Sequence, residues 1–469
     1  MHITGIGFGN LKGFSGARAV DHLPLSAPPG GGSWTVIAGR NGSGKSTFLR
    51  ALALCLAGPH VARSLVPDFG GWITGGERSA WARVYVRPDP TVDRLTGRGE
   101  APDRPVPLGL AWTAPEDTAD GPGSYQGLGV RQQPRVRGYL GQEHSGELDT
   151  IKQFAARGPW TSSVPQGWFC AAYGPFRRLT GGSDEARRLM LASGPAGRMA
   201  SLFHEDASLS EGVFWLKELR LRSLEEQQGA RELLNAVLRL LSDGLLPDRY
   251  RALRVNADGL WVAPDGSPER AYPLREMSDG FRTVASLVLD IVRQLQTTYG
   301  TLDLTSDDEG RPVIRMPGIV IIDEVDAHLH VTWQRQIGDW LRVHFPRIQF
   351  IVTSHSPYIC QAADPGGLIR LPGPDEDDRA PEVVDDGLYR RIVYGSGDDA
   401  ALSELFGLES PYSSRAELQR ARLVRLERKV FDDAASEEEL REYRHLSELL
   451  TSSLSARVDE VAARLGDHW

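Results

Sequence analysis

Residues 39–46 read Gly-Arg-Asn-Gly-Ser-Gly-Lys-Ser, and this stretch decides the fold. It matches the pattern GxxxxGK[ST], in which a glycine-rich loop wraps its backbone N–H groups around phosphate oxygens. The apolar run at residues 33–38 (SWTVIA) predicts a buried strand before the loop. Residues 47–56 (TFLRALALCL) predict a helix after it, which we expect to stop at Gly58-Pro59. A strand, a loop and a helix in this order indicate an α/β fold.

The same motif supplies the candidate residues of a nucleoside triphosphate site. Lys45 would reach the β- and γ-phosphates, and Ser46 would ligate Mg²⁺. The N-terminus of the following helix adds positive potential. We therefore expect ATP and Mg²⁺ as cofactors, with the nucleotide bound by Gly39, Asn41, Gly42, Gly44, Lys45, Ser46 and Thr47.

A second apolar run, residues 318–323 (GIVIID), does not alternate with polar residues, as expected for a strand covered on both faces. It delivers Asp323 and Glu324 at its carboxyl end, the edge where open α/β sheets bind ligands. We expect Asp323 to hold the Mg²⁺ shell and Glu324 to orient or deprotonate the attacking water. The alternative, a solvated acidic turn, is disfavoured beside a phosphate-binding motif.

Two further motifs narrow the class of protein. Residues 277–282 (MSDGFR) open a predicted helix, with Ser278 as its N-cap. Residues 353–357 (TSHSP) end the next buried strand and contain His355. Taken alone, the first is an ordinary capped helix and His355 is as readily a structural histidine.

In this order the four motifs resemble those of the ABC-type ATPases: Walker A, signature, Walker B and switch histidine. MSDGFR departs from the signature LSGGQ at Asp279, Phe281 and Arg282, which argues against a transporter domain. Residues 326–330 (DAHLH) resemble the D-loop of the RecF, OLD and SMC branch, whose following proline is Val331 here. The resemblance implies an ABC ATPase head, a P-loop sheet with helices on both faces.

The resemblance also implies a mechanism. Two chains would form a homodimer around two ATP molecules, and these dimers could build a higher oligomer. Ser278 and Gly280 of one chain would cap the γ-phosphate held by the other, and His355 would sense it.

Three segments look like stand-alone ATPase subunits of bacterial antiphage defence, of the Septu PtuA type: residues 12–14 (KGF), 172–178 (AYGPFRR) and 394–419. This likeness implies that the ATPase controls a separate effector, a nuclease. A nuclease within this chain is disfavoured, because the acidic run at residues 375–378 lies in a predicted Gly/Pro loop and the tail is helical.

Two alternatives stay open. One is a RecF-like ATPase of DNA repair or recombination that acts as a DNA clamp; the formal net charge of −9 disfavours it, because a clamp needs a basic inner face. The other is a scaffold whose ATP-bound form holds a partner inactive; the presence of both Lys45 and Glu324 disfavours it, because they permit turnover.

Periodicity and composition divide the 469 residues into four predicted parts. No heptad run long enough for an SMC-type coiled coil occurs, so the insert is a short helical arm. The parts are an N-terminal ATPase lobe (1–180), the helical arm (181–250), a C-terminal ATPase lobe with signature, Walker B, D-loop and switch histidine (251–375), and a mainly helical extension (376–469).

Several residues keep open roles. The glutamine loop that joins the lobes of ABC ATPases has candidates in Gln142, Gln166 and the segment 173–178. A zinc cluster of His328, His330 and His355 is disfavoured, because no cysteine supports it. Phosphate or DNA contact and a solvated basic face are the alternatives for Arg177, Arg178, Arg187 and Arg188.

The cysteines indicate a reducing compartment. Cys55, Cys170 and Cys360 lie far apart and form no CxxC pair. The first residues lack the pattern of a signal peptide, and no run of about 18 apolar residues occurs. We expect a cytoplasmic protein without a membrane span.

Overall fold

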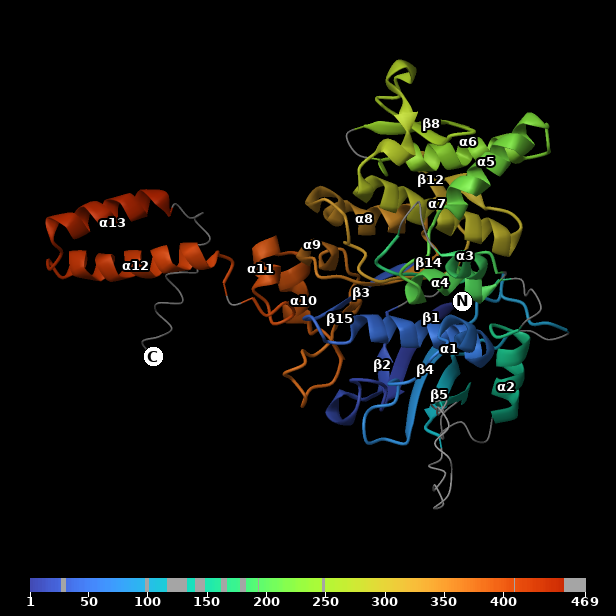
Figure 1. Ribbon diagram of the computed structural model, residues 1–469, viewed down its shortest axis with the longest axis horizontal. Coiled ribbons are helices and arrows are strands. Elements are labelled where there is room, and N and C mark those ends of the chain that lie inside the picture. Colours follow the sequence, from blue (N-terminus) through green and yellow to red (C-terminus); the bar gives the residue numbers. More distant parts are fainter. Residues whose placement is uncertain are drawn as a thin grey trace, which may run out of the picture. The chain divides into compact units, whose positions relative to one another are not determined.

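The larger part of the chain contains a six-stranded sheet in the order β16–β15–β3–β14–β13–β7. Its strands β15, β3 and β14 are labelled near the middle of Figure 1. All neighbours pair parallel except β15 and β16. The structure is a computed structural model that describes residues 1–26, 31–97, 101–115, 133–139, 148–161, 167–177, 183–192, 194–246, 249–408 and 410–450. The strands of this sheet are β3 (Ser33–Ala38), β7 (Cys170–Tyr173), β13 (Gly318–Ile322), β14 (Ile348–Thr353), β15 (Leu368–Arg370) and β16 (Glu382–Val383).

Both faces of this sheet are covered. Val36, Ile322 and Val352 face one hydrophobic core with the helices α7 (Asp279–Tyr299) and α8 (Val331–His344). Ile321 and Ile351 face the other core with α1 (Lys45–Leu65). Strands buried on both faces need no polar alternation, which is why their sequences are continuous apolar runs. The predicted fold class, a P-loop sheet with helices on both faces, is confirmed.

The helix α1 lies between two sheets. It contacts β13 and β14 of the central sheet and β4 and β5 of a second, antiparallel one. A helix that is apolar all round must be buried all round, and the run at residues 51–57 is buried throughout. The second sheet has the order β2–β1–β4–β5–β6, with strands β1 (His2–Gly9), β2 (Val20–Pro24), β4 (Ser79–Arg87), β5 (Val106–Thr113) and β6 (Arg135–Gly138).

The described residues of the predicted helical arm (181–250) include the helices α3, α4, α5 and α6. The first two, α3 and α4, pack on each other, and α4 contacts β7 and α1. The next two, α5 and α6, pack against β8 and β9, in the upper part of Figure 1. These elements are α3 (Asp184–Met190), α4 (Pro195–Phe203), α5 (Glu211–Leu224), α6 (Ala230–Ser242), β8 (Tyr250–Asn256), β9 (Gly259–Pro264) and β10 (Tyr272–Pro273).

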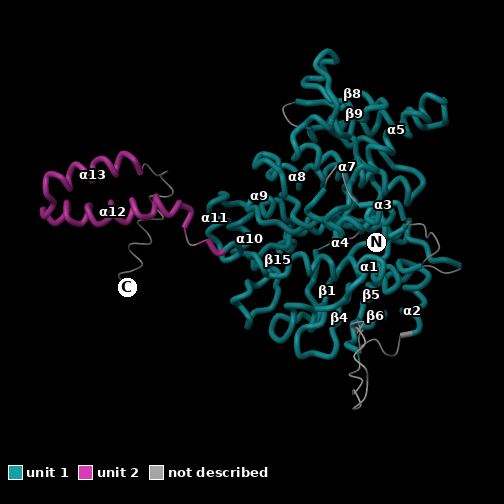
Figure 2. The backbone as a smooth tube through the Cα atoms, in the orientation of Figure 1, with its two compact units in different colours: residues 1–406 teal, residues 407–469 magenta. Residues whose placement is uncertain are grey.

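The chain divides into two compact units, residues 1–406 and 407–469 (Figure 2). In the described residues of the second unit, α12 (Ser414–Phe431) and α13 (Glu437–Leu449) pack on each other, and the predicted extension over 376–469 stays a prediction. The finer division of residues 1–406 stays a prediction. The first unit also contains α2 (Leu148–Arg157), β11 (Leu304–Ser306), β12 (Pro312–Ile314), α9 (Pro357–Cys360), α10 (Asp386–Val393) and α11 (Gly397–Ala401), and the short 3-10 helices η1 (Gly16–Arg18), η3 (Pro268–Arg270) and η4 (Leu274–Glu276).

The three cysteines are buried and unpaired. They lie in α1, β7 and α9. Burial raises the pKa of the Cys55 thiol to about 12, so this group carries no thiolate reactivity near neutral pH. Among the residues that the structure describes, no helix is both long and apolar enough to cross a membrane.

The expectation that the first helix stops at Gly58-Pro59 is confirmed in part, because the backbone at Gly58 is not helical and a second helical stretch follows this break directly. The helix α1 kinks there and runs on to Leu65, with Gly58 at φ 82° and ψ 168°. Pro59 has no N–H, so the carbonyl of Cys55 loses its helical donor, and the indole of Trp160 donates to that carbonyl instead, at 2.8 Å. A donor from outside the helix thus satisfies the carbonyl that the break leaves without a helical partner, and Pro59 is tolerated because it begins the second helical stretch.

Gly58→Ala tests this kink. Its φ and ψ belong to a region that essentially only glycine occupies, and an added Cβ would lie 2.6 Å from Cγ of Trp160. We expect a loss of about 2–4 kcal/mol in the free energy of unfolding, measured by urea titration. Gly229→Ala is the matched control, since its φ is also positive (76°) but nothing lies within 4 Å of the new Cβ; it should cost about 1 kcal/mol. Equal losses would contradict the role of Trp160.

Candidate nucleotide-binding site

The Walker A loop joins β3 to α1 and needs glycine at two positions. Gly42 and Gly44 have φ values of 80° and 97°, in the left-handed region. At Gly44 there is also no room, because a Cβ would lie 2.7 Å from Cζ of Phe14. The backbone angles therefore require glycine at both positions, and a glycine-rich loop of this kind can present its backbone N–H groups to phosphate.

Lys45 begins α1 and folds back over the loop. Its ammonium donates to the carbonyls of Gly39, at 2.8 Å, and Arg40, at 3.0 Å. The side chain is 7% exposed, and this burial lowers its pKa to about 8, although nearby carboxylates raise it. Phosphate oxygens could replace these two carbonyls as acceptors for the ammonium.

The Walker B residues Asp323 and Glu324 follow β13 at the edge of the sheet where the Walker A loop follows β3. Asp323 is 2% exposed, and its Oδ1 accepts a hydrogen bond of 2.6 Å from the hydroxyl of Thr353. That hydroxyl accepts in turn from the backbone N–H of Glu324, at 2.7 Å. Thr353 therefore orients both acidic residues, a role that we did not predict from the sequence. The position of Thr353 at the end of β14, the strand beside β13, is the signal from which this role could have been predicted.

Glu324 sits in a turn with an unusual backbone. Its φ is 45°, which costs about 1–2 kcal/mol in a residue other than glycine. Burial raises the pKa of its carboxyl, and the charges of Asp323 and Asp326 add to the rise. A carboxylate with a raised pKa is a better proton acceptor. This supports Glu324 as the group that faces the attacking water.

His355 lies beside the Walker A loop. Together with Gly39, Arg40 and Asn41 it lines a cavity of about 350 Å³. Burial and the charge of Lys45 lower the pKa of its imidazole, which favours the neutral form. A second cavity, of about 550 Å³, flanks the loop and is lined among others by Lys12, Phe14, Arg18, Gly42, Gly44 and Thr47.

The signature segment forms the start of α7. Ser278 is the N-cap residue as predicted, yet its exposed hydroxyl makes no capping hydrogen bond. Gly280 packs on the D-loop, since an added Cβ would lie 2.4 Å from the carbonyl oxygen of His328. Neither Ser278 nor Gly280 lines the two cavities beside the Walker A loop.

The D-loop ends in a helix without the proline of related sequences. The helix α8 begins at Val331, and the His330 side chain caps it by accepting from the N–H of Thr332, at 3.4 Å. Among the described residues, no three His, Cys, Asp or Glu side chains are grouped as a metal site.

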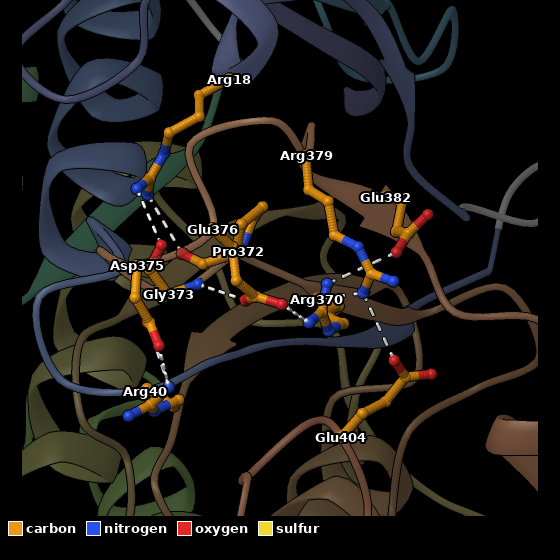
Figure 3. A network of polar contacts seen from close by, with 10 residues as sticks. All are labelled: Arg18, Arg40, Arg370, Pro372, Gly373, Asp375, Glu376, Arg379, Glu382 and Glu404. Carbon is orange, nitrogen blue, oxygen red and sulfur yellow. Dashed lines mark hydrogen bonds and ion pairs between the residues drawn. The ribbon is translucent and has the colours of Figure 1, made fainter.

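A loop after β15 is tied to the Walker A loop by arginines (Figure 3). Arg18, 8% exposed, donates to the carbonyl of Ser43, at 3.1 Å, and to those of Pro372 and Gly373, each at 3.0 Å. Arg40 pairs with Asp375 at 2.8 Å, with both side chains largely exposed. The acidic run 375–378 thus lies in a loop, as predicted, and is held against the phosphate-binding loop by contacts that the sequence does not reveal.

Among the basic residues after β7, Arg177 differs from both expectations. Arg177 is 2% exposed and bonds to backbone carbonyls, so a solvated face and a phosphate or DNA contact are both wrong for it. Arg187 and Arg188 are exposed on α3, where their roles stay predictions. Gln142, Gln166 and Arg178 lie outside the described residues.

Comparison with known proteins gives matches over the two segments that contain the Walker A loop and the Walker B strand. Residues 11–72 match the family "AAA domain", and residues 250–361 match "AAA domain, putative AbiEii toxin, Type IV TA system". The retron Ec83 probable ATPase of Escherichia coli is 40% identical over 89 residues, 19% of this chain and 15% of its own length. The Septu protein PtuA of Bacillus thuringiensis is 30% identical over 134 residues, 29% of this chain and 32% of its own.

This chain resembles the ABC-type ATPases of the defence-associated kind. It spans about a third or less of the length of these curated relatives. Among solved structures, the SMC head bound to the C-winged helix domain of ScpA aligns with 82% of this chain and 98% of its own, with 17% identity and a TM-score of 0.43. The SMC head of Thermotoga maritima aligns with 82% and 100%, with 15% identity and a TM-score of 0.39.

Arg18→Met tests the tie between the two loops. Removing a buried guanidinium leaves three carbonyls without their donor, so we expect a loss of about 2–4 kcal/mol in the free energy of unfolding. Arg40→Ala is the control and should change it by no more than about 0.5 kcal/mol, because its ion pair is exposed. Urea titrations of both variants give the comparison, and a stable Arg18→Met protein would show that the loop is held by other contacts.

Proposed function

We propose that this chain binds and hydrolyses ATP with Mg²⁺, dimerises around two nucleotides, and controls a separate effector nuclease in antiphage defence. One observation carries the proposal. The Walker A loop and the switch residue His355 share a cavity, whereas Ser278 and Gly280 line neither cavity beside that loop. A nucleotide site that needs these signature residues therefore needs a second copy of the chain.

The donor groups at the site fit Mg²⁺ and ATP. The glycine-rich loop and the Lys45 ammonium suit phosphate, and Oδ1 of Asp326 is buried without a hydrogen-bond partner among the described atoms. Ser46 and Asp323 would hold Mg²⁺, which usually takes few protein ligands. Bound there, Mg²⁺ would neutralise charge on the phosphates.

The chain's own residues then divide the work. Lys45 and the loop N–H groups hold the β- and γ-phosphates, and Glu324 accepts the proton of the attacking water or orients it. His355 contacts the γ-phosphate from the cavity that it lines beside Gly39. Positioning and charge stabilisation supply most of the catalysis in such reactions, so a preformed cluster suits the task.

The partner chain completes the site. The exposed Ser278 hydroxyl, which makes no capping bond, and the amide of Gly280 cap the γ-phosphate in trans. ATP then has a higher affinity for the dimer than for the separated chains, and hydrolysis reverses the preference.

The effector part rests on the named relatives. The Septu protein PtuA and the retron ATPases supply the likeness, and it covers only part of each chain. Within this chain the acidic run 375–378 lies in a loop and not at strand ends. We therefore expect the nuclease to be a separate polypeptide.

Mixing two inactive variants tests the shared site. Lys45→Ala removes the phosphate contact and Ser278→Arg blocks the signature, so neither should hydrolyse ATP alone. Mixed, they should regain up to about a quarter of the wild-type rate, because half of randomly formed dimers hold one intact site of two. Ser210→Arg, at the N-cap of α5, is the matched control and should retain full activity. No recovery in the mixture, with Lys45→Ala/Ser278→Arg heterodimers present by mass analysis, would sink the model of a site in trans.

Co-purification with the products of the native neighbouring genes tests the effector. Glu324→Gln should retain ATP and Lys45→Ala should lack it, so the pair compares the two nucleotide states of the full chain. We expect a nuclease to co-purify with one state more than with the other, by mass analysis of the complexes. An isolated dimer whose ATPase is stimulated by DNA would favour the RecF-like clamp instead.

A further inference from the structure

Arg177 holds the turn that carries Glu324. The strand β7 ends at Tyr173, beside Ile322 of β13, so the two chains leave the sheet at the same edge. From there the Arg177 guanidinium donates to the carbonyl of Asp323, at 2.9 Å, and through its second terminal nitrogen to that of Glu324, at 3.0 Å, and of Val325, at 3.4 Å. Its first nitrogen also donates to Gly174, at 2.9 Å. Three consecutive carbonyls are thus fixed by one side chain.

The turn is clamped from its opposite side by β14. The Thr353 hydroxyl accepts from the N–H of Glu324, and the Thr353 carbonyl accepts from the N–H of Val325 at 3.0 Å. Between these contacts Glu324 has its positive φ. A strained conformation persists only where its surroundings hold it, and the carbonyl donors on one side and the N–H acceptors on the other do so here.

Burying the charge of Arg177 costs free energy, and the charged groups around it indicate what offsets this cost. The side chain is almost fully buried, and burial lowers its pKa to about 10. Among the described carboxylates none forms an ion pair with it, whereas the charges of Asp326, Asp323 and Glu324 favour its protonated form. A neutral side chain could hold the turn by hydrogen bonds alone. The positive charge of Arg177 therefore also offsets the negative charges of the three nearby carboxylates.

We propose that Arg177 is a positioning residue for ATP hydrolysis, which fixes the backbone of Glu324 and thereby the place of its carboxylate. The inference rests on the proposed hydrolysis. It assigns the segment after β7 to the orientation of the attacking water, with no direct contact between Arg177 and the nucleotide.

The test compares two arginines that both donate to the backbone around β7, of which Arg177 is buried and Arg198 is half-buried. Arg177→Lys keeps the charge but loses the fork that spans three carbonyls. Arg198→Lys is the matched control, since Arg198 donates to the carbonyl of Cys170, at 3.0 Å, away from the turn. We expect Arg177→Lys to lower kcat by about 10- to 100-fold, with binding of a non-hydrolysable ATP analogue unchanged within about threefold. Arg198→Lys should keep kcat.

A double-mutant cycle separates positioning from general damage. If Arg177 acts through Glu324, adding Arg177→Lys to Glu324→Gln should not lower the residual rate further. Independent losses that multiply would overturn the inference, and so would a wild-type rate in Arg177→Lys. Misfolding of both Arg177→Lys and Arg177→Gln by circular dichroism, while Arg198→Lys folds, would assign Arg177 to folding alone. A wild-type protein that binds ATP and never hydrolyses it would overturn the proposed function as well.

Discussion

The register of the parallel sheet is the constraint on which the site depends. Tyr173, Ile322, Val352 and Val36 form one row across β7, β13, β14 and β3. Because this row is fixed, the chain segments that follow it leave the sheet at one edge. A slip of one residue in any pair would turn its side chains to the opposite face and disrupt the packing of both hydrophobic cores, so the fit of these side chains in their cores protects the register. The hydrophobic cores thus hold together groups that come from distant parts of the sequence.

Polar contacts fix the positions of the loops that the register of the sheet brings to one edge. The Thr353 hydroxyl joins the two acidic residues of Walker B, Arg18 joins the Walker A loop to the loop after β15, and Arg177 binds the turn between Walker B and the D-loop. The acceptors of both arginines are backbone carbonyls. Such acceptors do not depend on which side chain stands at their position, so these contacts tolerate sequence change in the loops that they bind.

The local parts of the site were predictable, and the parts made by tertiary contact were not. The Walker A glycines and the acidic pair are recognisable in the sequence because their chemistry needs residues at fixed spacing within a short stretch. Ser278 was predictable as an N-cap, but not that its hydroxyl makes no capping bond. The prediction for Arg177 was wrong, because a pair of arginines after a strand is typical of a surface, and the carbonyls of residues 323–325 that it binds lie about 150 residues away along the chain.

The fold shows the same division. Apolar runs without alternation predicted the central strands correctly, because burial on both faces leaves a strong compositional signal. The Gly58-Pro59 pair correctly predicted a break in the helix, but the sequence did not predict the second helical stretch after it or the hydrogen bond from Trp160, in a distant segment, to the carbonyl of Cys55. Likewise α8 begins at Val331 without a proline because His330 supplies the cap.

The burial of all three cysteines has a practical consequence. They lie in the cores of the first unit, at 0–2% exposure, so the native protein presents no accessible thiol of its own to a maleimide reagent. A single cysteine introduced at an exposed position would then carry a fluorophore or spin label selectively, without prior removal of the native ones. Distances between such labels in a pair of chains could follow nucleotide-driven movement in solution.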